Sequence, residues 1–389
     1  MEDLTASQNV IRKFEALHRT TPRIFRGPGR VNLIGEHTDY NDGFVLPFAI
    51  DRECIVAVAR RDDSLINVFA LDPDESAVID LAAAPIKKRG HWVDYVEGTA
   101  RSLMDKCEIG GADIVFSSDV PIGAGLSSSA AIEIAIGFAL ISIYGVDIEL
   151  KELAFAAQRA EHEFVGVCSG IMDQFASAFG KKGNAMLLDC RSLAIEYIPV
   201  ETGTSVIAVC DTKVKHELAS TEYNIRRQEC EKGVEILRSK LEGVRALRDV
   251  DSETFSRFEG ILPEPIRSRC KHVISENGRT LAAAECLKQN DLKKAGELMY
   301  ESHRSLRDDY QVSCPELDKL VDAAAKVNGV YGARMTGGGF GGCTVTLLER
   351  GSVDDFRKTV SRQYKSRFDV EPDIYLFQAA DGASEFTRA

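Results

Sequence analysis

The segment PIGAGLSSSA, residues 121–130, stands between a strand-like stretch and a helix-like stretch. Residues 112–118 before it form a short apolar run typical of a strand, and residues 130–145 after it carry Ala, Leu and Ile at helical spacing. Glycines let a backbone approach a ligand closely. The first N–H groups of a helix lack partners within the helix and lie at the positive end of its dipole. The segment therefore predicts a phosphate-binding loop between a strand and a helix.

The three serines of this segment leave two interpretations open. Their hydroxyls can bond phosphate oxygens or enter the coordination of Mg²⁺, which prefers oxygen ligands. The alternative is a plain glycine turn in which a serine caps the helix. Two common nucleotide-binding loops do not fit, because the pattern GxxxxGK(S/T) is absent and Gly123-Ala124-Gly125-Leu126-Ser127-Ser128 lacks the third glycine of GxGxxG. The sequence thus argues against an ordinary P-loop enzyme.

Outward from this segment, the chain predicts two domains of mixed α and β structure. Its 389 residues exceed what a single core usually supports. We place the domain crossing near residues 195–205, which assigns 1–200 to an N-terminal domain and 201–389 to a C-terminal α+β domain. Strands are expected at residues 23–33, 43–60, 65–71, 112–118, 185–188, 206–210, 332–335, 343–348 and 374–378, and helices at 130–145, 150–164, 224–241, 279–289, 291–306, 316–327 and 353–368.

Composition narrows the classes of partner. The formal net charge of −12 argues against a nucleic-acid or anionic-membrane partner, because those surfaces need a concentrated basic face. No run of eighteen apolar residues offers a membrane span. The ten cysteines show no CxxC pair, and the first residues show no secretory leader pattern. We expect reduced thiols and a cytoplasmic location, with neither zinc nor a disulfide framework.

A second glycine-rich segment, RMTGGGFGGC at residues 334–343, lies between two expected strands. Five glycines in six positions leave little side chain to pack, so structural economy alone explains this segment poorly. A backbone that wraps against a ligand or another loop explains it better. The segment therefore predicts a close backbone contact with a ligand or with another loop.

Two further clusters offer polar side chains. Near the N-terminus, GPGRVNLIGEHTDYNDG at residues 27–43 gathers Glu36, His37 and Asp39 in a turn, a chemistry suited to polyol hydroxyls, although a solvated loop is the alternative. In CSGIMDQ, residues 168–174, Asp173 has apolar neighbours, and an unpaired carboxylate there would be costly. A functional partner for Asp173 is therefore expected.

These segments together resemble the GHMP kinases, the superfamily that includes galactokinase, homoserine kinase, mevalonate kinase and phosphomevalonate kinase. Residues 121–130 resemble its second motif and residues 334–343 its third. RVNLIGEHTDYNDG, residues 30–43, is similar to the galactokinase signature in particular. The resemblance covers essentially the whole chain. It implies a two-domain α+β GHMP kinase fold, with an N-terminal mixed sheet and helices, a C-terminal α/β sandwich and the active site at the domain interface.

The resemblance also implies roles for single residues. Asp173 matches the catalytic aspartate and Arg30 the residue that faces the reacting centre, while Ser129 and Glu161 match the ligands of Mg²⁺. The implied contacts to the sugar are Glu36, His37, Asp39, Gly170, Asp173 and Tyr223, and those to ATP are Gly123, Ala124, Gly125, Leu126, Ser127, Ser128 and Ser129.

Three of these residues have plainer interpretations. Asp173 could be a helix-capping carboxylate. Glu161 could be a surface carboxylate of a helix. Tyr223, which precedes a long expected helix, could be a tyrosine that packs between the domains. Contacts of these side chains decide each case.

The activity implied by the family is phosphorylation of the C1 hydroxyl of galactose by ATP with Mg²⁺, the first step of galactose catabolism, carried out by a monomer. Asp173 would accept the hydroxyl proton while Arg30 keeps it ionised, since a nearby cation favours the charged form of a carboxylate. One rival is a kinase for N-acetylgalactosamine or arabinose. Another is a galactose-sensing regulatory protein, but relatives of that kind lack the Ser129-Ala130 pair that stands here.

Overall fold

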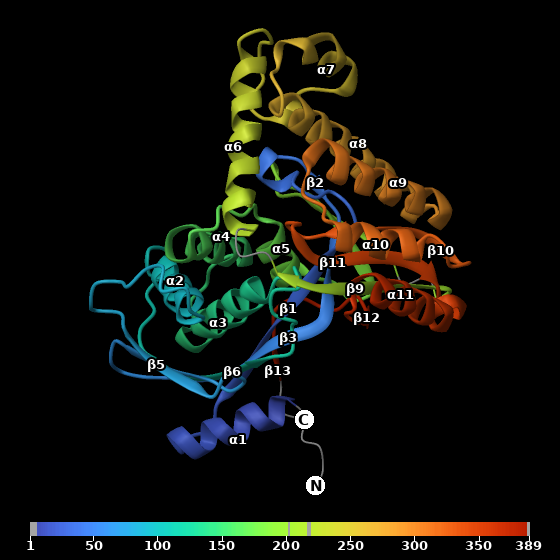
Figure 1. Ribbon diagram of the computed structural model, residues 1–389. Helices are drawn as coiled ribbons and strands as arrows, with labels where there is room; N and C mark the ends of the chain where they lie inside the picture. Colours follow the sequence, from blue (N-terminus) through green and yellow to red (C-terminus); the bar gives the residue numbers. More distant parts are fainter. Residues whose placement is uncertain (1–5, 201–202, 216–218, 387–389) are drawn as a thin grey trace.

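The computed structural model describes residues 6–200, 203–215 and 219–386, and in this part the first sheet has six strands (Figure 1). All neighbouring strands in it are antiparallel except β4 and β6, which run parallel, so the sheet is mixed as expected. In spatial order it contains β13 (Ser384–Phe386), β1 (Arg23–Asn32), β3 (Pro47–Arg60), β6 (Ala112–Ser118), β4 (Leu65–Ala70) and β5 (Glu75–Asp80).

Helices cover both faces of this sheet because its side chains alternate between them. Ile24 and Ile55 pack with Phe14 of α1 (Ala6–His18) on one face. Phe25 and Val56 point to the opposite face. That second face carries α2 (Val93–Met104), α3 (Ser128–Tyr144), α4 (Leu150–Ala160) and α5 (Met172–Phe179) (Figure 1).

A second sheet, antiparallel throughout, occupies the C-terminal half. Its spatial order is β10 (Val330–Thr336), β11 (Gly341–Glu349), β9 (Ser205–Lys215) and β12 (Asp373–Phe377). One face packs on α10 (Pro315–Ala324) and α11 (Val353–Phe368), and the other packs with α8 (Ile266–Lys288) and α9 (Leu292–Ser305). This arrangement is the helix-covered C-terminal unit that the resemblance implied.

The remaining elements lie outside these two sheets. A small sheet contains β2 (Phe44–Val45), β7 (Asn184–Asp189) and β8 (Ile195–Pro199). Helix α6 (Ala219–Arg238) and helix α7 (Ser252–Phe258) form a projection with the start of α8 (Figure 1). The short helical turns are η1 (Asp39–Asn41), η2 (Glu161–Val165), η3 (Leu247–Asp249), η4 (Glu259–Ile261), η5 (Leu306–Tyr310) and η6 (Arg350–Ser352).

The two sheets share one hydrophobic core. A single cluster includes Phe25 and Val56 of the first sheet together with Ile207 and Val345 of the second. Strand β13, from the end of the chain, also pairs with β1 in the first sheet. The division of the chain into two domains between residues 200 and 201 stays a prediction. Residues from both sides of that position contribute to this core.

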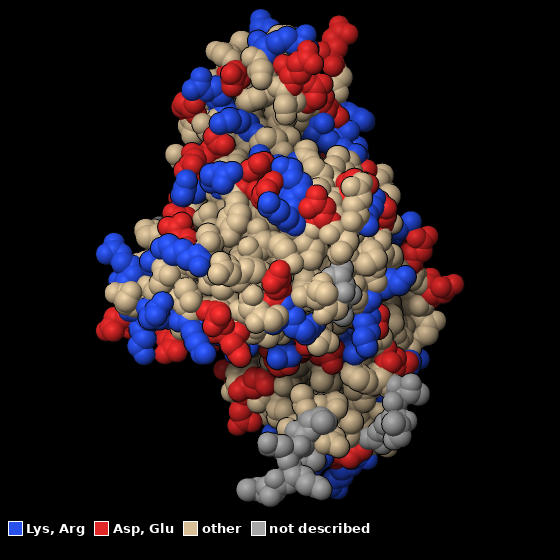
Figure 2. All heavy atoms as spheres, turned by 90° about the vertical axis from the view of Figure 1, so that its right-hand side faces the viewer, with Lys and Arg blue, Asp and Glu red and all other residues tan. Residues whose placement is uncertain are grey.

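Several elements differ from the sequence-based expectations. The helix expected at 279–289 begins at Ile266, and the helix expected at 150–164 changes at Glu161 from α-helical to π-helical geometry. The elements that were not expected are helices α1, α2, α5 and α7 and strands β5, β8 and β13. On the face shown in Figure 2, Lys and Arg side chains are interspersed with Asp and Glu.

Candidate active site

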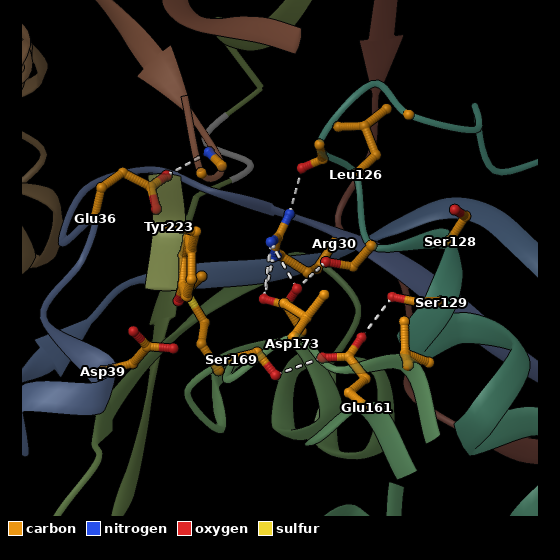
Figure 3. Close-up of a pocket in the computed structure, with 18 of the residues that line it drawn as sticks. Arg30, Glu36, Asp39, Leu126, Ser128, Ser129, Glu161, Ser169, Asp173 and Tyr223 are labelled. Carbon is orange, nitrogen blue, oxygen red and sulfur yellow. Dashed lines mark hydrogen bonds and ion pairs between the residues drawn. The ribbon is translucent and has the colours of Figure 1, made fainter. Parts of the chain in front are cut away.

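A cavity of about 430 Å³ opens where the loop before α3, the loop after β1 and the loop after β10 meet (Figure 3). It is roomy enough for a small organic ligand, since such sites usually measure about 300–1,000 Å³. Most of the residues singled out from the sequence lie in its walls: Arg30, Glu36, His37, Asp39, Gly123, Gly125, Leu126, Ser127, Ser128, Ser129, Glu161, Asp173 and Tyr223.

Two of the singled-out residues lie behind the walls. Ala124 is buried, and its carbonyl oxygen is 3.5 Å from where a Cβ on Gly342 would stand. Gly170 is packed against Asp39 so closely that a Cβ on it would stand 1.8 Å from Oδ2 of Asp39. Gly170 therefore leaves the space in which the Asp39 carboxylate sits.

Some wall residues were missed from the sequence. Five of them stand inside the quoted motifs and could have been named from those motifs: Ile122, Ser169, Met172, Gly337 and Gly338. Tyr95 lies on the unexpected helix α2, so no local signal pointed to it. The other missed wall residues are Val165 and Val167.

An ion pair between Arg30 and Asp173 stands at the centre of the cavity (Figure 3). Nε and Nη2 of Arg30 donate to the two carboxylate oxygens of Asp173, each over 2.8 Å. Nη1 donates to the carbonyl oxygen of Gly125 over 2.5 Å. Although burial alone would lower the pKa of Arg30, the carboxylates of Asp173, Glu36 and Asp39 raise it. The expected partner of Asp173 is thus confirmed.

Asp173 does not act as a helix cap. It lies in the first turn of α5, whose N-cap residue is Ile171, and its carboxylate accepts hydrogen bonds from the side chains of Arg30 and Ser127. The capping interpretation is therefore wrong. These contacts fix the carboxylate from two sides and leave part of its accepting capacity free, since two carboxylate oxygens offer about four lone-pair sites.

The loop before α3 presents its backbone rather than its side chains. Gly123 and Gly125 both have φ of +73°, a region that other residues enter at a cost. Ser127, the N-cap residue, has φ of +58° and makes no side-chain cap bond, because its hydroxyl donates to Asp173. The serine-cap interpretation is therefore wrong for Ser127. The first N–H groups of α3 remain open to a ligand.

Ser129 and Glu161 meet at one side of the cavity (Figure 3). The Ser129 hydroxyl donates to Oε1 of Glu161 over 2.7 Å, and the Ser169 hydroxyl donates to Oε2. Burial and the nearby carboxylate of Asp173 raise the pKa of Glu161, which is only 6% exposed. The surface-carboxylate interpretation is therefore wrong. The π-helical turn that begins at Glu161 accounts for this inward position, and such turns recur at functional sites.

The opposite side of the cavity carries Glu36, His37, Asp39 and Tyr223. Oε1 of Glu36 accepts a hydrogen bond from the Gly337 N–H over 2.8 Å. Nδ1 of His37 lies 2.8 Å from the Tyr40 hydroxyl, and burial lowers the pKa of His37 to about 3. The imidazole is therefore neutral at physiological pH.

Asp39 and Tyr223 complete this side. Burial, and then the charge of Asp173, raise the pKa of Asp39 to about 7. The Tyr223 ring lies 5.4 Å from the ring of His37 and 5.4 Å from that of Tyr40, between ring centroids. Tyr223 comes from α6, so it packs between distant parts of the chain and also lines the cavity.

Among the described residues, no group of three or more His, Cys, Asp or Glu side chains could hold a metal ion alone. The Ser129 hydroxyl and the Glu161 carboxylate nevertheless offer hard oxygen donors side by side. Mg²⁺ is usually held by one or two carboxylates together with substrate phosphates. The donor set therefore fits Mg²⁺ that arrives with a nucleotide. In the described ranges no helix is long and apolar enough to cross a membrane.

The fold and this site define a GHMP-type small-molecule kinase. The family model for the GHMP kinases N terminal domain matches residues 94–181, and the model for the GHMP kinases C terminal matches residues 283–366. A crystal structure of mevalonate kinase, 21% identical, aligns with a TM-score of 0.62 over 91% of this chain and 98% of its own, which shows the common fold.

Matches at higher sequence identity point to one family among the GHMP kinases. The galactokinase galactose-binding signature matches residues 12–60. A galactokinase of Chloroflexus aggregans is 50% identical over 89% of this chain and 88% of its own length, and one of Roseiflexus sp. is 46% identical over 92% of each. The crystal structure of Lactococcus lactis galactokinase complexed with galactose is 33% identical, with a TM-score of 0.94 over 97% of this chain and 99% of that one. The chain belongs to the galactokinase family. It is a kinase whose acceptor is a sugar hydroxyl.

Proposed function

We propose that this protein transfers the γ-phosphoryl group of ATP to the C1 hydroxyl of galactose, giving galactose 1-phosphate and ADP. One observation carries the proposal. The Arg30–Asp173 pair stands between a backbone loop suited to phosphates and a group of side chains suited to sugar hydroxyls. Phosphoryl transfer needs mainly positioning and charge stabilisation, and both ends of the cavity supply them.

At the centre, Asp173 accepts the proton of the C1 hydroxyl as that oxygen attacks the γ-phosphorus. Arg30 orients this carboxylate through two hydrogen bonds and stabilises charge on the group in transfer. Because Arg30 also donates to the Gly125 carbonyl, it ties the base to the phosphate loop. A base and a phosphate loop tied to one side chain keep a fixed spacing, which in-line transfer requires.

At the nucleotide end, the N–H groups of Gly123 to Ser129 bind the phosphates of ATP. Ile122, Val165, Val167 and Tyr95 offer apolar surface for the base. Ser129 and Glu161 would hold Mg²⁺. When bound, the ion neutralises charge on the phosphate oxygens.

At the sugar end, Glu36 and Asp39 accept hydrogen bonds from sugar hydroxyls, and neutral His37 offers one ring nitrogen. Tyr223 contributes its ring and hydroxyl, and Gly170 its backbone. These groups offer the separate donors and acceptors that sugar hydroxyls can bond. We also infer that the protein acts as a monomer in the cytoplasm, where its ten free cysteines would stay reduced.

An assay of ADP release tests the proposal directly. The purified protein is given MgATP with galactose, N-acetylgalactosamine, arabinose or no sugar. We expect turnover to be fastest with galactose, and ³¹P NMR to show a phosphate on C1. Faster turnover of another sugar would reassign the substrate. Galactose binding without ADP release would indicate a sensor, although Ser129 and Ala130 are both present.

A further inference from the structure

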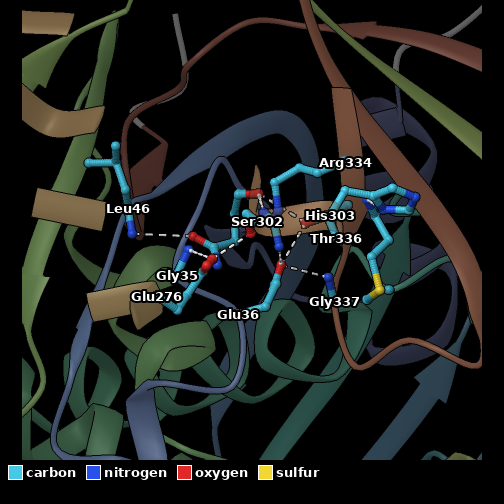
Figure 4. A network of polar contacts seen from close by, with 12 residues as sticks. Gly35, Glu36, Leu46, Glu276, Ser302, His303, Arg334, Thr336 and Gly337 are labelled. Carbon is cyan, nitrogen blue, oxygen red and sulfur yellow. Dashed lines mark hydrogen bonds and ion pairs between the residues drawn. The ribbon is translucent and has the colours of Figure 1, made fainter. Parts of the chain in front are cut away.

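A buried polar cluster lies behind the sugar end of the cavity, where the loop after β1 meets the end of β10 (Figure 4). Arg334 on β10 is fully buried and heads the fully buried side chains of the described chain in volume. A buried arginine costs several kcal/mol unless it is paired. The partners of Arg334 therefore show what the cluster is built around.

Three contacts of this cluster are made to one oxygen of Glu36, Oε1. Nη2 of Arg334 lies 3.0 Å from Oε1 of Glu36 in a buried ion pair. The Thr336 hydroxyl donates to the same oxygen over 3.0 Å, as the Gly337 N–H does over 2.8 Å. All three contacts end on Oε1, while the side chain lines the cavity. Oε2 is thereby left to the contents of the cavity.

The backbone beneath Glu36 is fixed by the same elements. Nη1 of Arg334 donates to the carbonyl oxygen of Asn32 over 3.0 Å, and the same carbonyl oxygen lies 3.0 Å from the Thr336 hydroxyl, whose single proton is shared between it and Glu36. Glu276 of α8 accepts from the Gly35 N–H over 3.1 Å. Burial opposes its ionisation, but the charges of Arg279, His272 and Arg334 hold the pKa of Glu276 at about 2. Glu36 is thus paired with the buried Arg334, and Glu276 with the partly buried Arg279.

We propose that Arg334 and Thr336 are positioning residues for sugar recognition, which hold Glu36 so that its free oxygen meets one hydroxyl of the sugar. The inference rests on the proposed function, because it names how the sugar end of that site is set. Strand β10, which leads into the third motif, would then help to bind the sugar and would not serve the nucleotide alone. Neither residue is among those that line the cavity.

Thr336→Val tests this inference, since it removes the hydroxyl and keeps the shape of the side chain. A hydrogen bond to a charged group is worth enough that we expect the KM for galactose to rise on the order of tenfold, with kcat and the KM for ATP nearly unchanged. Thr336→Ser should restore the wild-type KM. Thr346→Val is the matched control, because Thr346 lies buried on the neighbouring strand β11 and its hydroxyl has no hydrogen-bond partner.

A panel of deoxygalactoses sharpens the test. In the wild type, KM should rise for the deoxygalactose that lacks the hydroxyl bound by Glu36. In Glu36→Gln this rise in KM should be smaller, and only for that one position of the sugar. We expect Thr336→Val and Arg334→Lys to shrink the penalty at the same position and at no other. A purely structural role would weaken all sugars alike.

Three outcomes overturn the inference: an unchanged KM in Thr336→Val, an equal effect of Thr346→Val, or a uniform loss across the panel. Failure of the proposed function is a different result, namely a wild-type protein that does not phosphorylate galactose. In that case the sugar that is phosphorylated in the ADP assay replaces galactose, and its deoxy analogues form the panel. The same variants then show whether Arg334 and Thr336 position Glu36.

Discussion

The two ends of the cavity are built from different materials. The phosphate end, residues 121–130, offers backbone N–H groups and two glycines with positive φ, while its side chains serve other partners. The sugar end uses the side chains of Glu36, His37, Asp39 and Tyr223. The difference follows from the ligands, because phosphate needs several donors at once, whereas sugar hydroxyls need separate acceptors and donors.

This contrast sets how each end is supported. Backbone N–H groups at a helix start need no further anchor, since the helix itself orients them. Buried carboxylates need partners, and those of Glu36 come from the far end of the sequence. The sugar end therefore depends on tertiary contacts, and the phosphate end depends on local conformation. Substitutions should act differently at the two ends.

The largest effect is expected where the ends meet. Asp173→Asn should lower kcat about a thousandfold while ATP still binds, because the amide cannot accept the hydroxyl proton. Steady-state kinetics and ATP titration measure both. Asp189→Asn is a matched control, since Asp189 pairs with Arg248 outside the cavity and its side chain is 20% exposed, as is that of Asp173. Near-wild-type turnover in Asp173→Asn would remove this residue from the chemistry.

At the sugar end, Gly170→Ala should weaken galactose binding on the order of 30-fold, because an added methyl group forces the Asp39 carboxylate to move and costs its hydrogen bonds to the sugar. Calorimetric titration with galactose measures the loss. Gly278→Ala, at a helical position with open space around it, should leave binding unchanged. If both variants bind galactose like the wild type, the Asp39 carboxylate does not bind the sugar from its position against Gly170.

At the phosphate end, Gly125→Ala should raise the KM for ATP by about tenfold. The methyl group has room, with the nearest atom 3.5 Å away, but φ of +73° costs an alanine roughly 1–2 kcal/mol. Gly145→Ala carries similar strain at the other end of α3, at φ of +64° and in open space. It should lower the melting temperature without changing the KM for ATP. Equal KM values in the two variants would contradict a local role for the loop.

The smallest effect concerns pH and stability. The pKa of Asp39 is about 7 in the folded protein and near 3.8 unfolded, so below pH 3.8 the carboxyl is neutral in both states. As pH rises toward 7 the unfolded chain loses its proton first, which favours unfolding. Relative to wild type, Asp39→Asn should therefore gain stability between pH 4 and 7, by about 1–2 kcal/mol because water in the cavity screens part of the shift. Urea unfolding across this range measures the gain, and parallel curves would show that Asp39 ionises normally.

Sequence reasoning succeeded where the signal was local. The sheet-rich first third, the helices that cover its sheet and the strand-to-helix loop follow from periodicity and glycine placement, whereas the mixed pairing of the strands came from the family resemblance. It failed at α2, whose buried positions include the polar residues Asp94 and Glu97 and so hide the apolar pattern. It also missed the π-helical turn at Glu161 and the three-residue strand β13, because neither is encoded in residues nearby. The roles of the site residues stay predictions until the variants are measured.

The sequence by itself determined the kinds of group in the cavity: glycines and serines in one motif, carboxylates and a histidine in another, and the family that combines them. Only the tertiary structure decided which groups meet. Arg30 and Asp173 are 143 residues apart, and Glu36 and Thr336 are 300 apart. Such contacts depend on how strands and helices pack into one core, because burial makes each charge seek a partner that no local pattern specifies.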